Sequence, residues 1–255
     1  MTAAPVQDVS ETALMVAVLR ARENERARPL YRDQLALKLA GTRGPEIISG
    51  LPKIAAVVST WMIAVRTRVV DDMIREAIRV GVDTVINLGA GLDTRPYRLE
   101  LSQSLRWVEI DYPNIIDLKT VRLADEKPVC DLKRMPCDLT DPVALRALLS
   151  EVTQDTRSVL IVTEGVIPYL TNEEVEGLAE ALRSSSTVRF WIADYSSPLV
   201  RKGRERAIHR GRMQSAPFRF DPQDYFGFFS SRGWRATKYV GPSRRPNGLE
   251  EIHQG

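Results

Sequence analysis

The stretch over residues 87–95, with the sequence NLGAGLDTR, constrains the fold of this chain most strongly. It follows a short apolar run, Thr84-Val85-Ile86, that is typical of a buried strand. Its two glycines allow a sharp turn and let a ligand approach the backbone with no Cβ in the way. Pro96 then suits the first turn of a helix. A strand, a glycine turn and a helix open a nucleotide-binding βαβ unit, so an α/β fold is expected.

The residues around the glycines indicate which nucleotide is bound. Asp111 ends the next apolar run about 20 residues further on, where an acid can bind a ribose diol. Thr94 stands where a dinucleotide fingerprint has its third glycine. Asp93, beside it, would repel a pyrophosphate but would tolerate a ligand that carries a cation. S-adenosylmethionine (SAM) has an ammonium, a sulfonium and no phosphate, so it is favoured over NAD.

Bulk properties bound the class of protein. The chain has 255 residues, of which 44% are hydrophobic, enough for one large domain or a domain with a cap. A net charge of +3 is too small to argue for a nucleic-acid partner. We find no signal peptide and no apolar run of the roughly 18 residues that a membrane span needs. Cys130 and Cys137 lack a zinc or disulfide spacing, so we expect reduced thiols in a cytoplasmic protein.

The first 80 residues are expected to form a helical cap. Residues 9–25 and 33–40 have the spacing of two helices, and Pro52 opens a longer one. The apolar stripe of this long helix comprises Leu51, Ile54, Ala55, Val58, Met62, Val65, Val69 and Met73. Residues 81–255 would then form the SAM-binding core, with a lid around residues 198–230, all within one structural domain.

Several polar residues are placed where a ligand would lie. In an open α/β sheet, ligands bind at the carboxyl ends of the strands. Asp138 and Leu139 follow the third expected strand, where they could meet an adenine ring, although Asp138 could instead begin a turn. Glu164 follows the strand over residues 158–163 and could hold an ammonium. Arg66, on the long helix, could clamp a carboxylate with two hydrogen bonds or lie on a solvated flank.

The last third of the chain breaks the alternating pattern. Residues 201–212 contain six Lys or Arg, with His209 among them. This stretch is either a solvated face or mobile lid, or it attracts an anionic acceptor. Asp221-Pro222 is expected to cap a helix through Phe229, and residues 234–240 to form a last strand. No convincing partner strand follows, so the final strand would be missing or supplied by a second chain in a homodimer.

Together these motifs resemble the leucine carboxyl methyltransferase family, including its bacterial polyketide and natural-product O-methyltransferase branch. The resemblance runs from about Asp8 to Gly241. It implies a class I SAM-methyltransferase fold, with a Rossmann-like sheet, and SAM as the cofactor. It also implies residue roles, which are Arg66 on the SAM carboxylate, Gly89 near the methionine moiety with Gly91 in the same turn, Asp111 on the ribose, Asp138 and Leu139 on adenine, and Glu164 near the amino group.

The chemistry of methyl transfer bears on the acceptor. A carboxylate acceptor is ionised at pH 7, whereas a phenol, with a pKa of about 10, needs a base. Candidate bases are few, namely His209, Tyr169, Tyr195 and Glu164. Their scarcity favours the carboxylate or acidic hydroxyl of a small molecule, as in secondary metabolism. The alternatives are an NAD(P)-dependent oxidoreductase and a non-catalytic SAM-binding protein.

Overall fold

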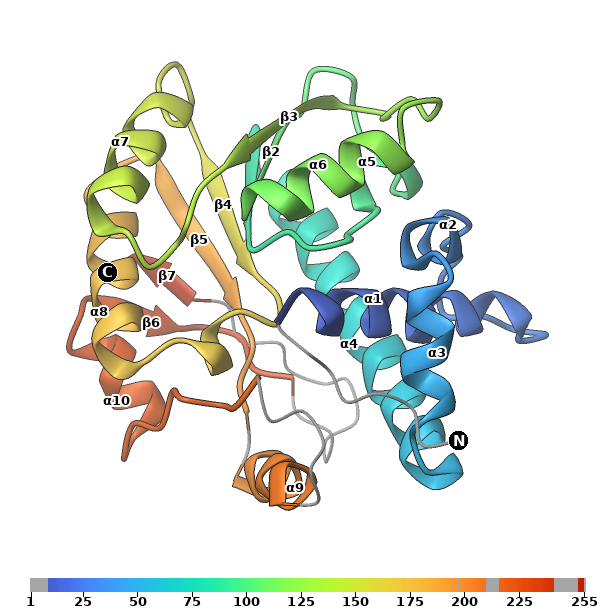
Figure 1. Cartoon of the computed structure of the whole chain (residues 1–255). Helices are drawn as coiled ribbons and strands as arrows, with labels where there is room; N and C mark the ends of the chain where they lie inside the picture. The colour runs from blue at the N-terminus through green and yellow to red at the C-terminus, as the bar shows by residue number, and fades with distance from the viewer. Residues whose placement is uncertain (1–8, 197, 210–215, 241–251, 255) are drawn as a thin grey trace.

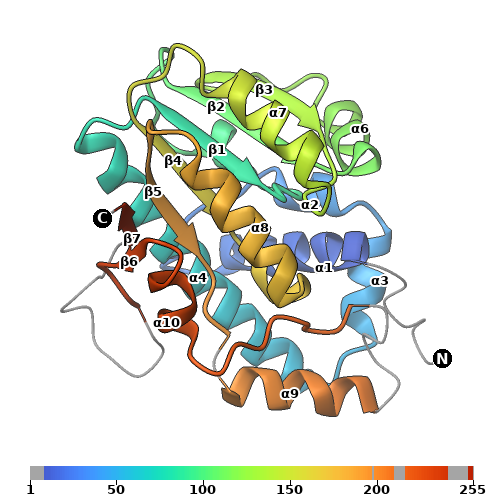
Figure 2. The ribbon, with the colours of Figure 1, turned by 90° about the vertical axis from the view of Figure 1, so that its left-hand side faces the viewer.

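The computed structural model describes residues 9–196, 198–209, 216–240 and 252–254. A seven-stranded sheet in the order β3-β2-β1-β4-β5-β7-β6 carries helices on both faces (Figures 1 and 2). The first five strands in this order are parallel, and the last two are antiparallel. The strands are β1 (Thr84–Leu88), β2 (Arg106–Asp111), β3 (Asp131–Pro136), β4 (Val159–Thr163), β5 (Val188–Ala193), β6 (Trp234–Ala236) and β7 (Ile252–Gln254).

The helices occupy most of the intervening chain. They are α1 (Val9–Ala21), α2 (Ala36–Ala40), α3 (Arg43–Ser49), α4 (Lys53–Arg79), α5 (Arg95–Arg98), α6 (Pro113–Arg122), α7 (Pro142–Val152), α8 (Asn172–Arg183), α9 (Pro198–His209) and α10 (Tyr225–Ser230), with 3₁₀ turns η1 (Arg22–Glu25) and η2 (Ile167–Tyr169). None of the helices in the described ranges is both long and apolar enough to cross a membrane.

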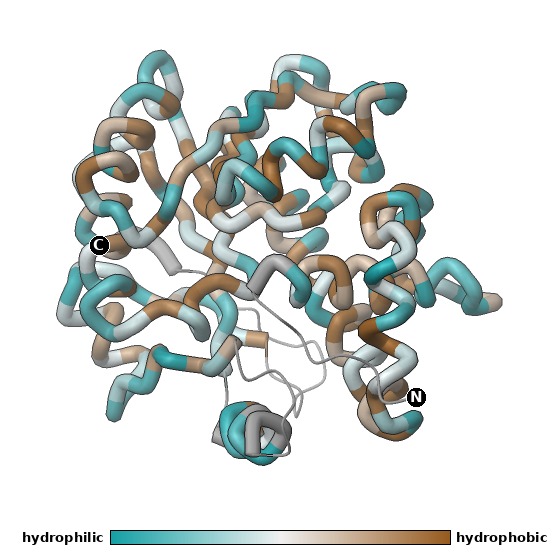
Figure 3. Tube along the Cα trace, in the orientation of Figure 1, coloured by the Kyte–Doolittle hydropathy of each residue, from teal (hydrophilic) through white to brown (hydrophobic). Residues whose placement is uncertain are grey.

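Strand alternation divides the core into two layers. One face carries Val85, Trp107 and Leu160, which are partners in register, and packs against Val70, Ile74 and Ala77 of α4. The opposite face carries Ile86, Val108 and Ile161 and packs against α7, α8 and α10. The central strands consist largely of hydrophobic residues, whereas α9 is mostly hydrophilic (Figure 3). The period-2 pattern thus places α4 on one face of the sheet and α7 and α8 on the opposite face.

The helices before β1 pack onto the glycine turn. Apolar residues of α1, α2 and α3 form one buried cluster that includes Leu92. Arg20 of α1 donates a hydrogen bond to the Leu92 carbonyl at 2.5 Å and another to Asp33 at 2.9 Å. This layer therefore lies directly against the segment that the sequence marks as ligand-binding (Figure 1).

Helix α3 was not expected from the sequence, and it contains Gly44 and Pro45, residue types that usually interrupt helices. Pro45 lies in the first turn of α3, where a missing N–H leaves no intrahelical bond unmade. Gly44 packs so closely on α1 that an added Cβ would lie 2.7 Å from Val18 Cγ2. The close approach of two helices, which the sequence pattern does not reveal, explains this glycine.

The expectation that the final strand is missing or comes from a second chain is wrong. Strand β7 pairs antiparallel with β5 through Trp191 and Ile252, and it also pairs with β6. Strand β6 is shorter than expected, and α10 begins at Tyr225. A three-residue strand in a polar tail is too short to show a readable periodicity, and only its backbone pairing with β5 and β6 defines it. Residues 241–251, expected to be loosely ordered, lie outside the described residues.

Candidate active site

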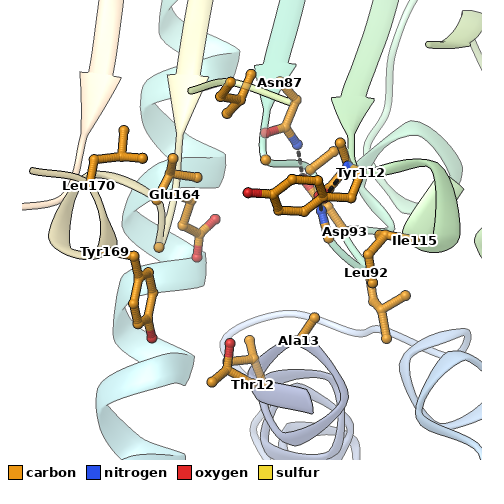
Figure 4. A pocket seen from close by; sticks show the side chains of 18 of the residues that line it. Thr12, Ala13, Asn87, Leu92, Asp93, Tyr112, Ile115, Glu164, Tyr169 and Leu170 are labelled. Atoms are coloured by element: carbon orange, nitrogen blue, oxygen red, sulfur yellow. Dashed lines mark hydrogen bonds between the residues drawn. The ribbon is translucent and has the colours of Figure 1, made fainter. Parts of the chain in front are cut away.

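A cavity of about 290 Å³ opens at the carboxyl ends of β1, β2 and β4 and is bounded on its far side by α1 (Figure 4). In Figure 4, Thr12 and Ala13 of α1 lie across the cavity from Glu164, which follows β4, and from Tyr169 of η2. Tyr112 projects from the end of β2. The expected site residues that line this cavity are Arg66, Gly89, Gly91, Asp111, Leu139, Glu164 and Tyr169. The fold therefore brings together residues that span more than 100 positions of the chain.

The glycine turn needs both of its glycines. Gly89 has φ +65° and Gly91 has φ +48°, a region that favours glycine. A Cβ at Gly89 would overlap the Val166 side chain after β4. The N–H groups of Gly89 and Ala90 both donate to the Ile110 carbonyl, at 2.8 and 3.1 Å. The end of β2 thus fixes the turn, and α5 beyond it is a single helical turn, too short to present the long helix N-terminus that binds a pyrophosphate.

Asp111 lies at the end of β2 with its carboxylate held by backbone. Its Oδ2 accepts from Gly91 N at 2.6 Å, and its Oδ1 accepts from Tyr112 N at 2.7 Å. Burial raises the pKa of this carboxyl, while the bonds from Gly91 and Tyr112 oppose that rise. A carboxylate has about four acceptor positions, so two remain for the hydroxyls of a ribose diol.

Asp93 is occupied by protein partners. It accepts from Asn87 Nδ2 at 2.9 Å and from Arg95 Nη1 at 2.8 Å. Arg95 also binds Asp71 of α4 and Glu164 Oε2, each at 2.7 Å. Burial disfavours the charged form of Asp93, but the field of Arg95 and other cations outweighs it and holds the pKa of Asp93 well below its usual range. The expected repulsion of phosphate by Asp93 is therefore largely compensated, and the residue joins the turn to α4.

Arg66 faces the cavity and is not a solvated flank of α4. Its Nε donates to Glu164 Oε1 at 2.8 Å, and its Nη1 lies 3.4 Å from Asp194 Oδ2 at the end of β5. Burial disfavours ionisation of Glu164, yet Arg95 and Arg66 prevail and lower its pKa. The Arg66 side chain remains 30% exposed, so donors are left for a ligand carboxylate.

Asp138 lies differently from the other expected site residues. It is exposed, and its Oδ1 accepts from the N–H and the hydroxyl of Thr140, at 2.9 and 2.8 Å. This is the turn-forming geometry that the sequence left as an alternative, and Leu139, not Asp138, lines the cavity. His209 ends α9, and its side chain lies outside the described part of the structure.

A second cavity, of about 360 Å³, adjoins the first. The two share Arg66, Gly165 and Tyr169 in their walls. The second is mainly apolar and aromatic, and its lining includes Trp61, Met62, Val69, Met73, Phe190, Ile192, Asp194, Tyr195, Val200, Phe218 and Tyr239. Met62 belongs to the apolar stripe that the sequence pattern predicts for α4, but it is 44% exposed, and its neighbour Trp61 is 52% exposed. Asp194 was missed as a site residue, although its position at a strand end was a readable signal.

The polar groups of the first cavity match SAM. Asp111 offers acceptors for a diol, Arg66 donors for a carboxylate and Glu164 a partner for an ammonium. Ile115, Val166 and Leu170 supply apolar walls of the kind that an adenine ring needs. Within the described residues, no group of three or more His, Cys, Asp or Glu side chains could hold a metal ion.

Comparison of the sequence with known proteins identifies the family. The family model described as leucine carboxyl methyltransferase matches residues 13–183. A protein of Frankia alni named as a SAM-dependent methyltransferase is 32% identical over 242 residues, covering 90% of this chain and 83% of that protein. A similarly named protein of Streptomyces coelicolor is 30% identical over 240 residues, covering 89% and 83%.

The fold is shared with a solved structure. A crystal structure of a methyltransferase from Thermobifida fusca matches with a TM-score of 0.56 at 17% identity, over 99% of this chain and 95% of that one. The glycine turn after β1 and Asp111 at the end of β2 both lie within the residues that the family model matches. The chain belongs to the leucine carboxyl methyltransferase family and is a SAM-dependent methyltransferase with the class I fold.

Proposed function

We propose that this protein transfers the methyl group of SAM to an oxygen atom of a small molecule. The observation that carries the proposal is the pair of adjoining cavities, one with the polar groups that suit SAM and one mainly apolar. Their common wall at Arg66, Gly165 and Tyr169 is where donor and acceptor would meet. Small-molecule sites are typically apolar pockets with a few convergent polar groups, as the second cavity is.

In this proposal each cavity residue has a distinct task. Asp111 accepts from the ribose hydroxyls, Arg66 donates to the carboxylate of SAM, and Glu164 accepts from its ammonium. The Leu139 N–H contacts the adenine ring, and Asp138, which also has Tyr112 as a side-chain hydrogen-bond partner, accepts from the adenine amino group. Gly89 and Gly91 let the methionine portion approach the backbone, which any Cβ would prevent.

Positioning supplies most of the rate enhancement in such a reaction. Bound SAM supplies an electrophilic methyl group whose sulfur leaves as a neutral thioether. The protein therefore has to align the acceptor oxygen with that methyl, which lowers the barrier by as much as about 7–11 kcal/mol. Oxygen is supported as the acceptor atom by the family description, which names a carboxyl group.

The test is a transfer assay with SAM labelled in the methyl group. The purified protein is incubated with a panel of small aromatic and aliphatic acids and hydroxyl compounds, and methyl ethers and esters are identified by mass spectrometry. The expected result is SAM-dependent formation of at least one of them, with tight binding of SAM and none of NADH by calorimetry. Binding of SAM with label transferred only to nitrogen, carbon or nothing would contradict O-methylation.

A further inference from the structure

Asp194 occupies the junction of the two cavities. It follows β5 directly, and it lines the apolar cavity beside Gly165, a residue of the shared wall. Its Oδ2 accepts a short hydrogen bond from the Gly165 N–H and lies 3.4 Å from Arg66 Nη1. Its backbone carbonyl accepts from the Tyr225 hydroxyl at 2.8 Å. The position of the carboxylate is therefore fixed by three elements of the fold.

The second oxygen of this carboxylate is available to a ligand. No hydrogen bond or ion pair to Asp194 Oδ1 occurs among the residues that the structure describes. The side chain is nevertheless only 16% exposed. A largely buried carboxylate oxygen needs a donor, and a ligand in the apolar cavity is in a position to provide one.

The local charges disfavour an anionic reacting group. Arg66 is the cation next to Asp194, and it is shared with Glu164, which it meets at the shorter distance of 2.8 Å. Arg95 is already bound by Asp71, Asp93 and Glu164. Lys238, which also lines the apolar cavity, is paired with Glu76. An acceptor carboxylate placed beside Asp194 would put two like charges in a poorly solvated site, whereas a neutral hydroxyl would donate to Oδ1.

The cavity also indicates what carries the hydroxyl. Aromatic side chains of Trp61, Tyr169, Phe190, Tyr195 and Phe218 line it. Their edges and faces suit a planar ring system, and the volume of about 360 Å³ lies in the range of small-molecule sites. Building on the O-methyl transfer proposed above, we infer that the acceptor is an uncharged aromatic hydroxyl compound and that Asp194 is the base that accepts its proton.

The step balances without a further reactant. The hydroxyl proton passes to Asp194 Oδ1 as the acceptor oxygen forms its bond to the methyl carbon. The bond between that carbon and sulfur breaks, and its electron pair stays on sulfur. The products are an aryl methyl ether and S-adenosylhomocysteine, and Asp194 then releases the proton to solvent.

The surroundings of Asp194 favour this role. Burial raises the pKa of its carboxyl, Glu164 after β4 raises it further, and Arg66 of α4, the Gly165 N–H and Arg95 of α5 act against the rise. Tyr225 of α10 contacts the backbone carbonyl of Asp194, and burial and the charge of Asp194 raise the pKa of the Tyr225 hydroxyl. A base whose pKa is moved toward neutrality is better matched to a proton from a phenol.

Binding measurements test the charge argument without turnover. The probes are 1-naphthol and 1-naphthoate, added to the protein saturated with S-adenosylhomocysteine and followed by calorimetry at pH 7. We expect the wild-type protein to bind the naphthol at least tenfold more tightly. Asp194→Asn should reduce the ratio of the two affinities at least tenfold, chiefly by improving naphthoate binding. The matched control is Asp117→Asn, on an exposed position of α6, which should change neither affinity.

Wild-type preference for naphthoate would overturn the inference with no variant needed. Asp194→Asn keeps an oxygen for the Gly165 N–H, so it should fold and bind SAM within about threefold of wild type. Its kcat for 1-naphthol should fall by about 10²–10⁴-fold at pH 7 and partly recover at high pH, where the hydroxyl ionises by itself. A loss of SAM affinity with kcat unchanged at saturation would make Asp194 a positioning residue for Arg66.

The two proposals fail in different ways. If the wild-type protein esterifies carboxylates but leaves hydroxyls unmodified, O-methylation stands and the aromatic hydroxyl is wrong. If it binds SAM but methylates neither class, the O-methyl transfer itself is wrong.

Discussion

At Asp111, two backbone N–H groups hold a carboxylate that is only 8% exposed and lines the first cavity. The same bonds tie the acid to the glycine turn, because one of the donors is Gly91. The residue therefore has a structural and a ligand-facing role at once. Arg66 has the same double character, since it pairs with Glu164 and still presents donors to the cavity.

Replacing Asp111 with Ala should weaken SAM binding by about 1.5–3 kcal/mol, the scale of a hydrogen bond to a charged group. Calorimetry with SAM measures this, and thermal unfolding without SAM shows how much of the effect comes from the turn. Asp117→Ala, on the exposed face of α6, is the control. Unchanged affinity in Asp111→Ala would remove Asp111 from the ribose site.

Arg66→Lys keeps the charge but loses the planar fork that binds a carboxylate through two bonds. SAM affinity should drop about tenfold or more, because a single ammonium cannot serve both Glu164 and the ligand carboxylate. Arg68 lies two positions further along α4 and is exposed, so Arg68→Lys should have no effect on SAM binding. Equal affinities for wild type and Arg66→Lys would show that Arg66 serves only to hold Glu164.

The two halves of helix α4 lie in different environments. Its carboxyl-terminal half packs on the sheet through Val70, Ile74 and Ala77. Its amino-terminal half presents apolar residues outward, with Val57 68% and Trp61 52% exposed. The 3.6-residue period alone cannot separate a face that meets a sheet from one that lines a cavity, because both are apolar.

Trp61→Ala should therefore affect acceptor binding, whereas Ile74→Ala should affect stability. Trp61→Ala should raise the acceptor KM with little change in the free energy of unfolding, because the side chain is half exposed at the cavity. Ile74→Ala removes a side chain with 0% exposure and should cost about 2–5 kcal/mol of stability. Urea unfolding and steady-state kinetics on both variants make the comparison. Equal destabilisation by the two substitutions would show that Trp61 belongs to the core.

Across the whole molecule, a buried ion network joins the helical layer to the sheet. Asp71 of α4 binds Arg95 and Arg98 of α5, and Arg95 reaches Asp93 and Glu164. Removing one member leaves an unpaired buried charge, which typically costs about 3–5 kcal/mol. The network thus couples the position of α4, and with it Arg66, to the glycine turn.

Acid should unfold the protein through this network. The folded-state pKa values of Asp93 and Glu164 are lowered, so their contribution is present above the unfolded pKa of about 4 and is lost as pH falls below it. Asp111 and Asp194, whose pKa values are raised, act in the opposite direction as pH falls. Protonation of Asp93 and Glu164 also breaks their buried ion pairs with Arg95, so the free energy of unfolding should fall steadily below pH 4. Urea titrations from pH 6 to pH 3 measure it, and a flat profile would contradict the argument.

The sequence by itself determined the features that local chemistry specifies. The glycine turn, Pro96 in the next helix and the acid ending β2 are all where the pattern predicted. So are β1 and β4, because all of their residues are buried and such strands read as nearly continuous apolar runs. Each of these depends on residues within one turn or one strand of each other, and a sequence shows such neighbours directly.

The tertiary structure decided everything that depends on distant partners. Arg66 and Glu164 are 98 positions apart, and their pairing, like that of Arg66 with Asp194, exists only because the middle of α4 passes the edge of the sheet where β4 and β5 end. The apolar cavity on α4 and the pairing of β7 with β5 have the same origin. Apolar residues and short polar strands carry no label for what they contact, since burial and hydrogen bonding arise between segments that only the fold brings together.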